Sequence, residues 1–398
     1  MTRNNTRLGL FLGPLTVGGS RKLSVLVLTS SVLLSLTTVA MAQSDTVRAL
    51  YISAANVPTN ITSIHTYAEA PKGFNPVAAS DEELATYGFP LRPDKQADPK
   101  HYALWERAMV AAKIRWNGEL KPLPTGGSAM MWARSSSSQP PAAPALTGPK
   151  HVSTPNWSGV VLQNSLKTWS NKTSFNDIWT IISVPVSELP FASGSCYSSG
   201  ATDLLELSFA GIDGYNPFFI ANGALQGGVY SDINCGSGTT SYYAYVGWGY
   251  ASAEFSVNPG DLFYTEVHGL GGFNPGTVYI EDLTTLTYNS YVINNTSLVP
   301  QVGNQAVWGV GRYCCNGSNP YPLANTIGIS FEGAAALNGS GKYFFPGSQA
   351  TSTAILTMRD DGNTQNIELV NQGSFGFQGQ QSLFFETTGC SYTGGCIP

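Results

Sequence analysis

Charged residues are scarce in this chain of 398 residues: Asp, Glu, Lys and Arg together make up 11%, less than half the usual share of about 25%. Because few carboxylates are available to titrate, a fold built from this sequence loses little stability when acid protonates them. The composition therefore suits an acidic environment. Residues 151–398 carry 5 Lys and Arg against 16 Asp and Glu, whereas residues 43–150 carry 11 against 9. The acidic balance of the later part argues against nucleic acid as its partner.

Several motifs that would indicate metal or serine chemistry are also missing. The chain has no C-x-x-C pair, and its 4 histidines are scattered without ligand spacing, so we expect no metal site and no cofactor. No G-x-S-x-G sequence is present, and His268 has no recognisable partner in the sequence. Both observations argue against a serine hydrolase. Carbohydrate cleavage by paired carboxylates would fit a β-sandwich but has no motif of its own here.

The N-terminus has the features of a secretory signal. A basic pair at 21–22 precedes an apolar and hydroxylic run over 23–40, and Ala40-Met41-Ala42 supplies the small residues of a cleavage site. A membrane anchor is the alternative, but no second apolar segment follows the first. We therefore expect residues 1–42 to be a signal peptide and the remainder to be secreted as an extracellular monomer that does not contact a membrane.

All 6 cysteines follow this signal. In an exported chain disulfide bonds are expected. The short Cys390–Cys396 loop is the easiest pair to propose. Cys196 and Cys235 either bridge each other or reach Cys314 and Cys315, and the sequence does not choose among these connectivities.

Helical signals are confined to the front of the chain. Ser80 precedes three acidic residues at a helix start, and Asp98-Pro99 opens a second stretch with apolar residues at helical spacing. We therefore expect a helical pro-region over residues 43–121, followed by a linker rich in Pro, Ser and Gly over residues 122–150. The helical part is either a pro-region that covers the main domain until it is removed or a permanent accessory region.

The rest of the chain consists of short strand-like runs separated by turn residues. This spacing predicts an all-β sandwich or barrel. One stretch, Leu204–Val229, contains two such runs joined by a Gly-Ile-Asp-Gly turn, and the second run carries Gln226. In another, Leu262–His268, alternation places Glu266 and His268 on the same face. The candidate strands are Trp157–Gln163, Ile178–Val186, Asp203–Ile212, Ala224–Val229, Tyr242–Trp248, Leu262–Leu270, Thr277–Asp282, Gln305–Gly311, Thr326–Glu332, Ala354–Met358 and Ser382–Glu386.

Several stretches resemble motifs of the secreted glutamic peptidases (eqolisins) and follow one another in the same order as in that family. The helical part before the linker resembles the pro-region of the bacterial members. The stretches are Leu84–Pro93, Asn156–Val161, Ser208–Gly214, Ala224–Val229, Pro259–Asp261, Tyr279–Thr284 and Pro322–Ala324. The resemblance implies a concanavalin-like or jelly-roll sandwich of two antiparallel sheets, with a small helical pro-region in front. It places the sandwich at residues 151–337 and leaves residues 338–398 as a C-terminal extension without a functional interpretation.

The resemblance also implies acid-active endopeptidase chemistry on polypeptides. In that family a glutamate takes a proton from the attacking water, and a glutamine amide donates a hydrogen bond to the oxyanion. Gln226 falls on the glutamine position. The residues expected to line a substrate cleft with it are Trp157, Phe209, Asp213, Tyr245 and Trp248.

The glutamate of the family motif has no counterpart in this sequence. The family's Ala-Glu-Trp-Ile-x-Glu strand corresponds to Ala306–Gly311, so its two glutamate positions are occupied by Val307 and Gly311. Gly247 stands at a further acidic position of the family, and Phe209 replaces the cleft tryptophan. Because an amide alone cannot activate water, the loss of its partner removes nearly all of the rate.

Two functional hypotheses follow. In the first, the protein keeps a cleft that binds a peptide or a glycan but cleaves polypeptides weakly or not at all. In the second, it is an active acid endopeptidase that uses a different carboxylate, with Glu206, Glu254, Glu266 and Glu332 as candidates. Each of these is otherwise an ordinary strand carboxylate that faces solvent or is hydrogen-bonded.

Overall fold

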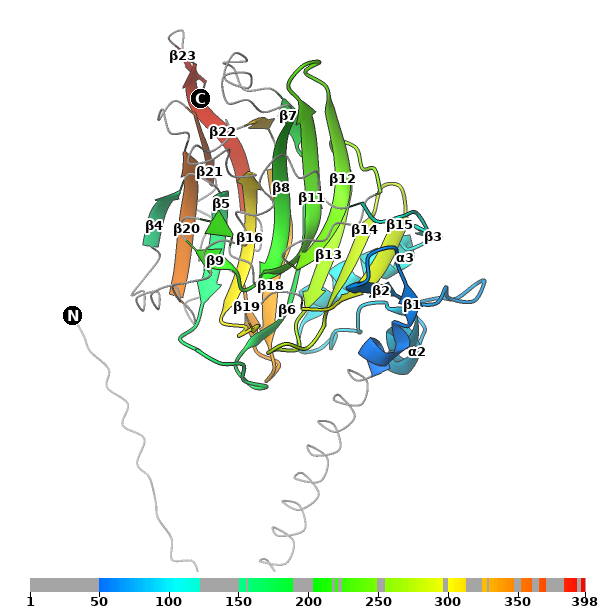
Figure 1. Ribbon diagram of the computed structural model, residues 1–398. Helices are drawn as coiled ribbons and strands as arrows, with labels where there is room; N and C mark the ends of the chain where they lie inside the picture. The colour runs from blue at the N-terminus through cyan, green and yellow to red at the C-terminus, as the bar shows by residue number, and fades with distance from the viewer. Residues whose placement is uncertain are drawn as a thin grey trace, which may run out of the picture. The chain divides into compact units, whose positions relative to one another are not determined.

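The computed structural model describes residues 50–121, 150–154, 157–188, 203–216, 219–220, 224–248, 255–295, 300–312, 324–327, 329–346, 352–359, 365–369, 383–391 and 395–397 (Figure 1). The expected signal peptide, nearly all of the expected linker and Glu254 lie outside these ranges. Residues 50–398 form one compact unit. Among the described residues, no helix is long and apolar enough to cross a membrane.

The first layer, called sheet I here, contains the two runs of the Leu204–Val229 stretch. They form β8 and β11, which pair antiparallel with Gln226 opposite Gly211. The order across sheet I is β12, β11, β8, β16, β5, β20 and β4, antiparallel except for the last pair. The bounds are β12 (Thr240–Trp248), β11 (Leu225–Asn234), β8 (Asp203–Ile212), β16 (Gln305–Arg312), β5 (Trp157–Gln163), β20 (Ser352–Arg359) and β4 (Lys150–Thr154).

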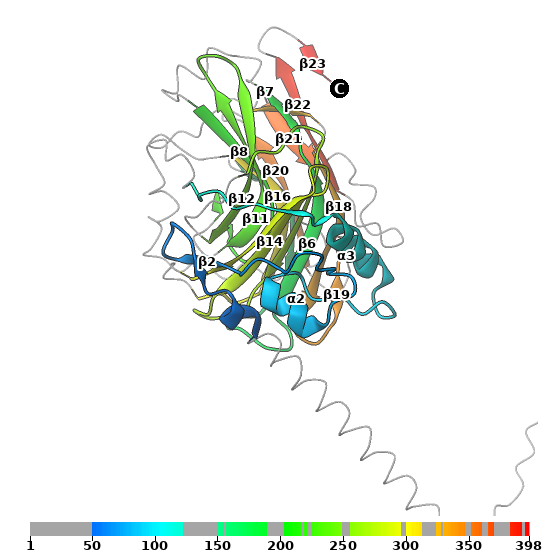
Figure 2. The same cartoon turned by 90° about the vertical axis from the view of Figure 1, so that its right-hand side faces the viewer.

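The second layer, sheet II, packs face to face on sheet I. Its order is β22, β18, β6, β13, β14, β15, β2 and β1, all antiparallel. The bounds are β22 (Leu383–Ser391), β18 (Ile329–Asn338), β6 (Phe175–Ser183), β13 (Leu262–His268), β14 (Gly276–Asp282), β15 (Thr287–Ile293), β2 (Ile64–Thr66) and β1 (Val57–Pro58). The expected sandwich of two antiparallel sheets is confirmed, and Figure 2 shows the layers from the side.

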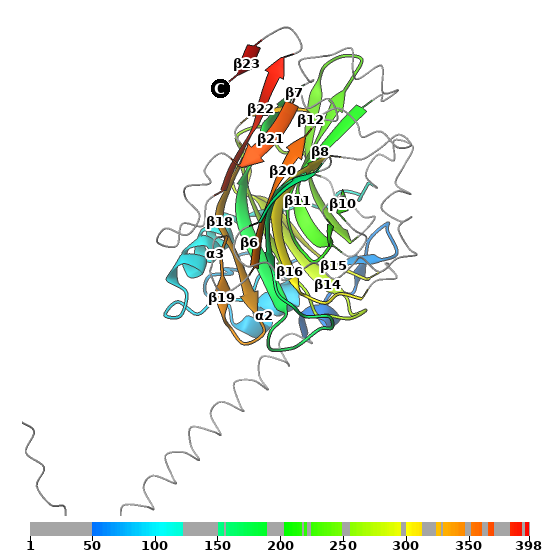
Figure 3. The ribbon, with the colours of Figure 1, turned by 90° about the vertical axis from the view of Figure 1, so that its left-hand side faces the viewer.

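Shorter strands complete the sheets or stand beside them. The strand β21 (Gln365–Leu369) pairs with both β20 and β22, so it joins the two layers along one edge (Figure 3). The remaining strands are β3 (Ile114–Arg115), β7 (Val186–Glu188), β9 (Tyr215–Asn216), β10 (Phe219–Ile220), β17 (Asn325–Ile327), β19 (Tyr343–Phe344) and β23 (Gly395–Ile397).

The main core lies between the two sheets, because alternate residues of every strand face inward. From sheet I it contains Leu225, Ala210 and Trp308, and from sheet II it contains Ile178 and Val278, all fully buried. The other face of each sheet points outward. On sheet II that outer face is covered by residues 50–121, whose buried side chains form a second apolar cluster with it.

Two complete helices lie in this covering part, in addition to the helical residues 50–54, and both begin where the sequence predicts. Ser80 caps α2 (Asp81–Tyr87), and its side chain and that of Glu83 form a reciprocal capping box. Asp98 caps α3 (Pro99–Ala111), with Pro99 in the first turn. The front is not purely helical, however, because β2 and β3 both pair with β15 of the sandwich.

The expected domain end at residue 337 divides strands that pair with each other. After this point, β20 pairs with β5 in sheet I, and β22 pairs with β18 in sheet II. The strands in residues 352–391 are therefore part of the sandwich. The expected strand Thr326–Glu332 is also divided: β17 pairs with β7 in a separate two-stranded sheet, and β18 belongs to sheet II.

Candidate functional site

Gln226 lies near the start of β11, the strand next to the edge strand β12 of sheet I, in a row of residues that pair directly across strands. Its partner on β12 is Gly247 and its partner on β8 is Gly211, which in turn pairs with Val307 on β16. Leu225, the neighbour of Gln226, belongs to the core between the sheets. Because side chains alternate along a strand, the row containing Gln226 and Val307 faces outward.

Gly211 separates Gln226 from Val307 and carries no side chain. The two flanking residues are two strand spacings apart, about 10 Å between Cα atoms. A Cβ atom on Gly211 would lie 2.9 Å from the Leu225 carbonyl oxygen and 3.1 Å from the Gln226 Cβ. Glycine at this position therefore keeps free the space over which side chains at 226 and 307 can approach each other.

The amide of Gln226 is oriented by a tyrosine of the neighbouring strand. The Tyr245 hydroxyl donates to Gln226 Oε1 at 3.4 Å. Within the described part of the chain this is the only hydrogen bond of the Gln226 side chain. Since the carbonyl end is engaged, the NH2 end is the one left to donate to another group.

A second row lies beside the first on the same outward face. Phe209 pairs with Gly228 and Gly309, and Gly228 pairs with Tyr245. The structure therefore brings together three of the residues expected at the cleft: Gln226, Phe209 and Tyr245. Gln226 is 5% exposed, Phe209 1% and Tyr245 0%. All three side chains are buried in the structure.

Trp248 does not belong to this face, and its expected place in the cleft is wrong. It pairs with Leu225 and is buried in the core between the sheets. Its position next to Gly247 turns its side chain to the opposite side of β12. The backbone of Trp157 lies opposite Gly311 in the pairing of β5 with β16, and its side chain lies outside the described residues.

Asp213 clamps a loop. It follows β8 at a positive φ of 62°, and its carboxylate accepts the backbone N–H groups of Val302 at 2.7 Å, Gly303 at 2.8 Å, Asn304 at 2.9 Å and Gln305 at 3.3 Å. Burial raises the pKa of Asp213 to about 6, and the four N–H donors oppose that rise. Both carboxylate oxygens are thus occupied by the loop that leads into β16, so the structure gives Asp213 no free atom for a substrate.

The lost glutamate positions differ in their distance from Gln226. Val307 is in the same row as Gln226. Gly311 pairs with Leu207, whose partner on β11 is Tyr230. Position 311 is four positions along the strand from 307, or about 13 Å in an extended strand. Of the two positions, 307 is the one in register with Gln226, and its side chain is apolar and 3% exposed.

The alternative carboxylates that the structure describes lie away from Gln226. Glu206 is on β8, five residues from Gly211, or about 16 Å along the strand, and its side chain points to the opposite face. Glu266 pairs with Trp179, and Glu332 pairs with Ile181, both on the outer face of sheet II. These positions count against recruitment of Glu206, Glu266 or Glu332 as the base.

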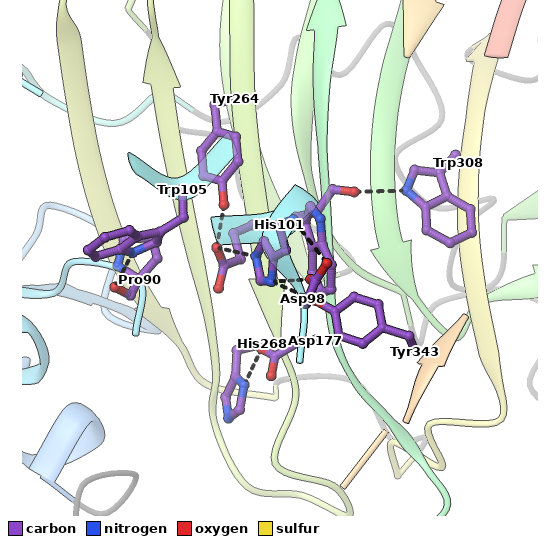
Figure 4. Close-up of polar contacts among 11 residues, drawn as sticks. Pro90, Asp98, His101, Trp105, Asp177, Tyr264, His268, Trp308 and Tyr343 are labelled. Carbon is purple, nitrogen blue, oxygen red and sulfur yellow. Dashed lines mark hydrogen bonds and ion pairs between the residues drawn. The ribbon is translucent and has the colours of Figure 1, made fainter. Parts of the chain in front are cut away.

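Sequence reasoning missed a partner for His268. Its Nδ1 lies 2.5 Å from Asp177 Oδ1 (Figure 4), and the two residues are directly paired on β13 and β6. They are 91 positions apart in the chain, so no local pattern could have joined them. The prediction that Glu266 and His268 share a face is confirmed, and residues 50–121 pack against that face.

The described residues contain no group of three or more His, Cys, Asp or Glu side chains that could hold a metal ion. Cys235 takes part in a disulfide bond. Cys390 and Cys396 face each other in the pairing of β22 with β23, which fits the pair proposed from the sequence. That disulfide stays a prediction.

Comparison with known proteins identifies the family. The family model described as the Peptidase A4 family matches residues 155–374, more than half of the chain. No curated protein matches the chain. Among solved structures, SCP-B, a member of the eqolisin family of peptidases in a complex with the tripeptide Ala-Ile-His, is 16% identical, with 58% of this chain and 97% of that chain covered and a TM-score of 0.41.

Two further peptidase structures resemble the chain. Scytalido-glutamic peptidase with a peptide-based transition state analog is also 16% identical over 58% of this chain and 97% of that chain, with a TM-score of 0.41. Aspergilloglutamic peptidase from Aspergillus niger is 20% identical over 46% of this chain and 98% of that chain, with a TM-score of 0.36. The extent of the family match shows that this chain belongs to the peptidase A4 family, the glutamic peptidases.

Proposed function

We propose that this protein is a secreted, peptide-binding member of the peptidase A4 family that has lost the general base and cleaves polypeptides weakly or not at all. Gln226 is the retained oxyanion donor of the family mechanism, and its carbonyl is held by Tyr245. A neutral amide stays a donor at any pH but cannot take a proton from water.

The main observation behind the proposal concerns the two residues that pair with Gly211. Gln226 pairs with it on β11, and Val307 pairs with it on β16, at a position where the family motif has glutamate. The candidate carboxylates Glu206 and Glu266 lie on other faces. The row therefore contains a hydrogen-bond donor for an oxyanion. Among the residues that the structure describes, it contains no carboxylate that could take a proton from the attacking water.

Val307→Glu tests this proposal directly. A carboxylate at 307 would lie in the row of Gln226, with only Gly211 between them, and general-base catalysis contributes about 10²–10⁴-fold to a rate. We expect the purified parent to release few or no peptides from acid-denatured casein. The variant should release them at least about 100-fold faster than the parent, as measured by mass spectrometry.

Two further variants serve as controls. Val307→Gln adds a side chain of the same size as glutamate that cannot act as a base, so this variant should stay inactive. Gly311→Glu restores the second family position and should have less effect than Val307→Glu, because position 311 is in the row of Leu207. Robust cleavage by the parent, abolished by Gln226→Ala, would overturn the proposal.

A further inference from the structure

The described front of the chain, residues 50–121, is attached to sheet II by backbone hydrogen bonds. This N-terminal segment adds β2 to the edge of β15, and β3 pairs with β15 as well. The backbone N–H of Ile114 donates to the Leu286 carbonyl at 2.9 Å, and that of Trp116 donates to the Tyr288 carbonyl at 2.9 Å. The segment therefore occupies an edge that would otherwise present unpaired N–H and C=O groups.

The N-terminal segment also supplies part of the apolar core. Ile64 and Leu120 belong to the cluster between the two sheets, and both are buried. From α3, Trp105 and Met109 pack in the second cluster, on the outer face of sheet II. Residues of sheet II in that cluster include Tyr264, Trp179, Tyr279 and Tyr288. Loss of the segment would expose a large aromatic face and open one side of the main core.

Polar contacts hold α3 in one position on this face. The His101 ring lies flat on Trp179, with 3.5 Å between ring centroids and 5° between planes, and its Nδ1 lies 3.0 Å from the Tyr343 hydroxyl (Figure 4). His101 Nε2 is 4.0 Å from Glu266 Oε2. These contacts join α3 to β6, β13 and β19.

We propose that the outer face of sheet II is the docking surface for this chain's own residues 50–121, which remain bound as a non-covalent subunit when the chain is cut within residues 122–149. The composition of 122–149 marks it as the place where a protease would cut. The segment covers sheet II, whereas Gln226 faces outward from sheet I. It completes the fold and does not plug the Gln226 face.

The test uses the full chain with the recognition site of a sequence-specific protease inserted within residues 122–149. After cutting, denaturing gel electrophoresis should show two pieces. Size-exclusion chromatography at low micromolar concentration should show them eluting together, with the circular dichroism of the uncut protein. Elution of the larger piece alone, with unchanged circular dichroism, would overturn the proposal.

A pair of neighbouring substitutions on α3 sharpens the test. Met109 is 0% exposed and Val110 is 56% exposed. Met109→Ala removes buried methylene groups and should raise the dissociation constant of the cut complex at least about 30-fold, while Val110→Ala leaves it unchanged. Equal dissociation constants for the two variants would contradict docking through this face of α3.

Discussion

Asp213→Ala is expected to lower the free energy of unfolding by about 4 kcal/mol or more. The substitution leaves four backbone N–H groups, from Val302 to Gln305, without the carboxylate that accepts them. It also places alanine at a positive φ, which costs roughly 1 kcal/mol. Urea denaturation followed by circular dichroism measures the loss.

Two further variants test whether the loss of stability comes from the lost hydrogen bonds to the loop or only from the loss of a negative charge. Asp213→Asn tolerates the left-handed backbone and keeps one carbonyl oxygen, so it should recover part of the lost stability. Glu332→Ala removes an exposed carboxylate from β18 and should change the free energy of unfolding by no more than about 0.5 kcal/mol. If Asp213→Ala behaved like Glu332→Ala, the loop would not depend on this clamp.

The second large effect concerns Glu206, which is buried inside the sandwich. Its side chain is 3% exposed, it accepts a hydrogen bond from the Thr326 hydroxyl, and its Oε1 has no hydrogen-bond partner among the side chains that the structure describes. Burial raises the pKa of Glu206 from 4.5 to about 7. Between these values the native state binds more protons than the unfolded state, so stability falls as the pH rises through this window.

Glu206→Gln should remove this dependence. Below pH 4.5 both proteins are neutral at position 206 and should be equally stable. Above pH 7 the variant should be more stable than the parent by roughly 3 kcal/mol, because each unit of pKa shift corresponds to about 1.4 kcal/mol. Thermal or urea unfolding at a series of pH values measures the difference.

A matched control for this experiment is Glu188→Gln, on the exposed end of β7. It should follow the parent at every pH, and an equal gain in both variants at pH 8 would contradict the account given for Glu206. Burial also raises the pKa of Asp213 to about 6, and burial with the nearby Asp203 raises that of Asp232 to about 6. All three groups make the parent more stable as the medium turns acidic, which agrees with the scarcity of charge in the sequence.

The strands of sheet I illustrate what a local pattern predicts well. The bounds expected for β5 and β8 match the structure, and so do the caps of α2 and α3. Each of these depends on residues within one turn or one strand. The strand β15 was missed, because the run Thr287–Ile293 mixes polar and aromatic residues without a clear turn before it.

Faces and partners required the tertiary structure. Alternation along β12 shows that Tyr245 and Trp248 lie on opposite faces, but it does not say which face meets the other sheet. That was decided by the packing of Trp248 against Leu225 and the rest of the core. The same limit applies to His268 and Asp177, which meet only because β13 pairs with β6.

The sequence by itself determined the class of fold, the two helix starts, the stretch that carries Gln226 and the absence of glutamate from the strand Ala306–Gly311, since all of these are properties of consecutive residues. Only the tertiary structure decided that Val307 is the residue in register with Gln226 and that Asp213 is a loop clamp. It also decided that residues 50–121 cover the sheet opposite the Gln226 face. These relations depend on strand register and on contacts between segments far apart in the chain, where the free energy of burial, and not a local preference, selects the partner.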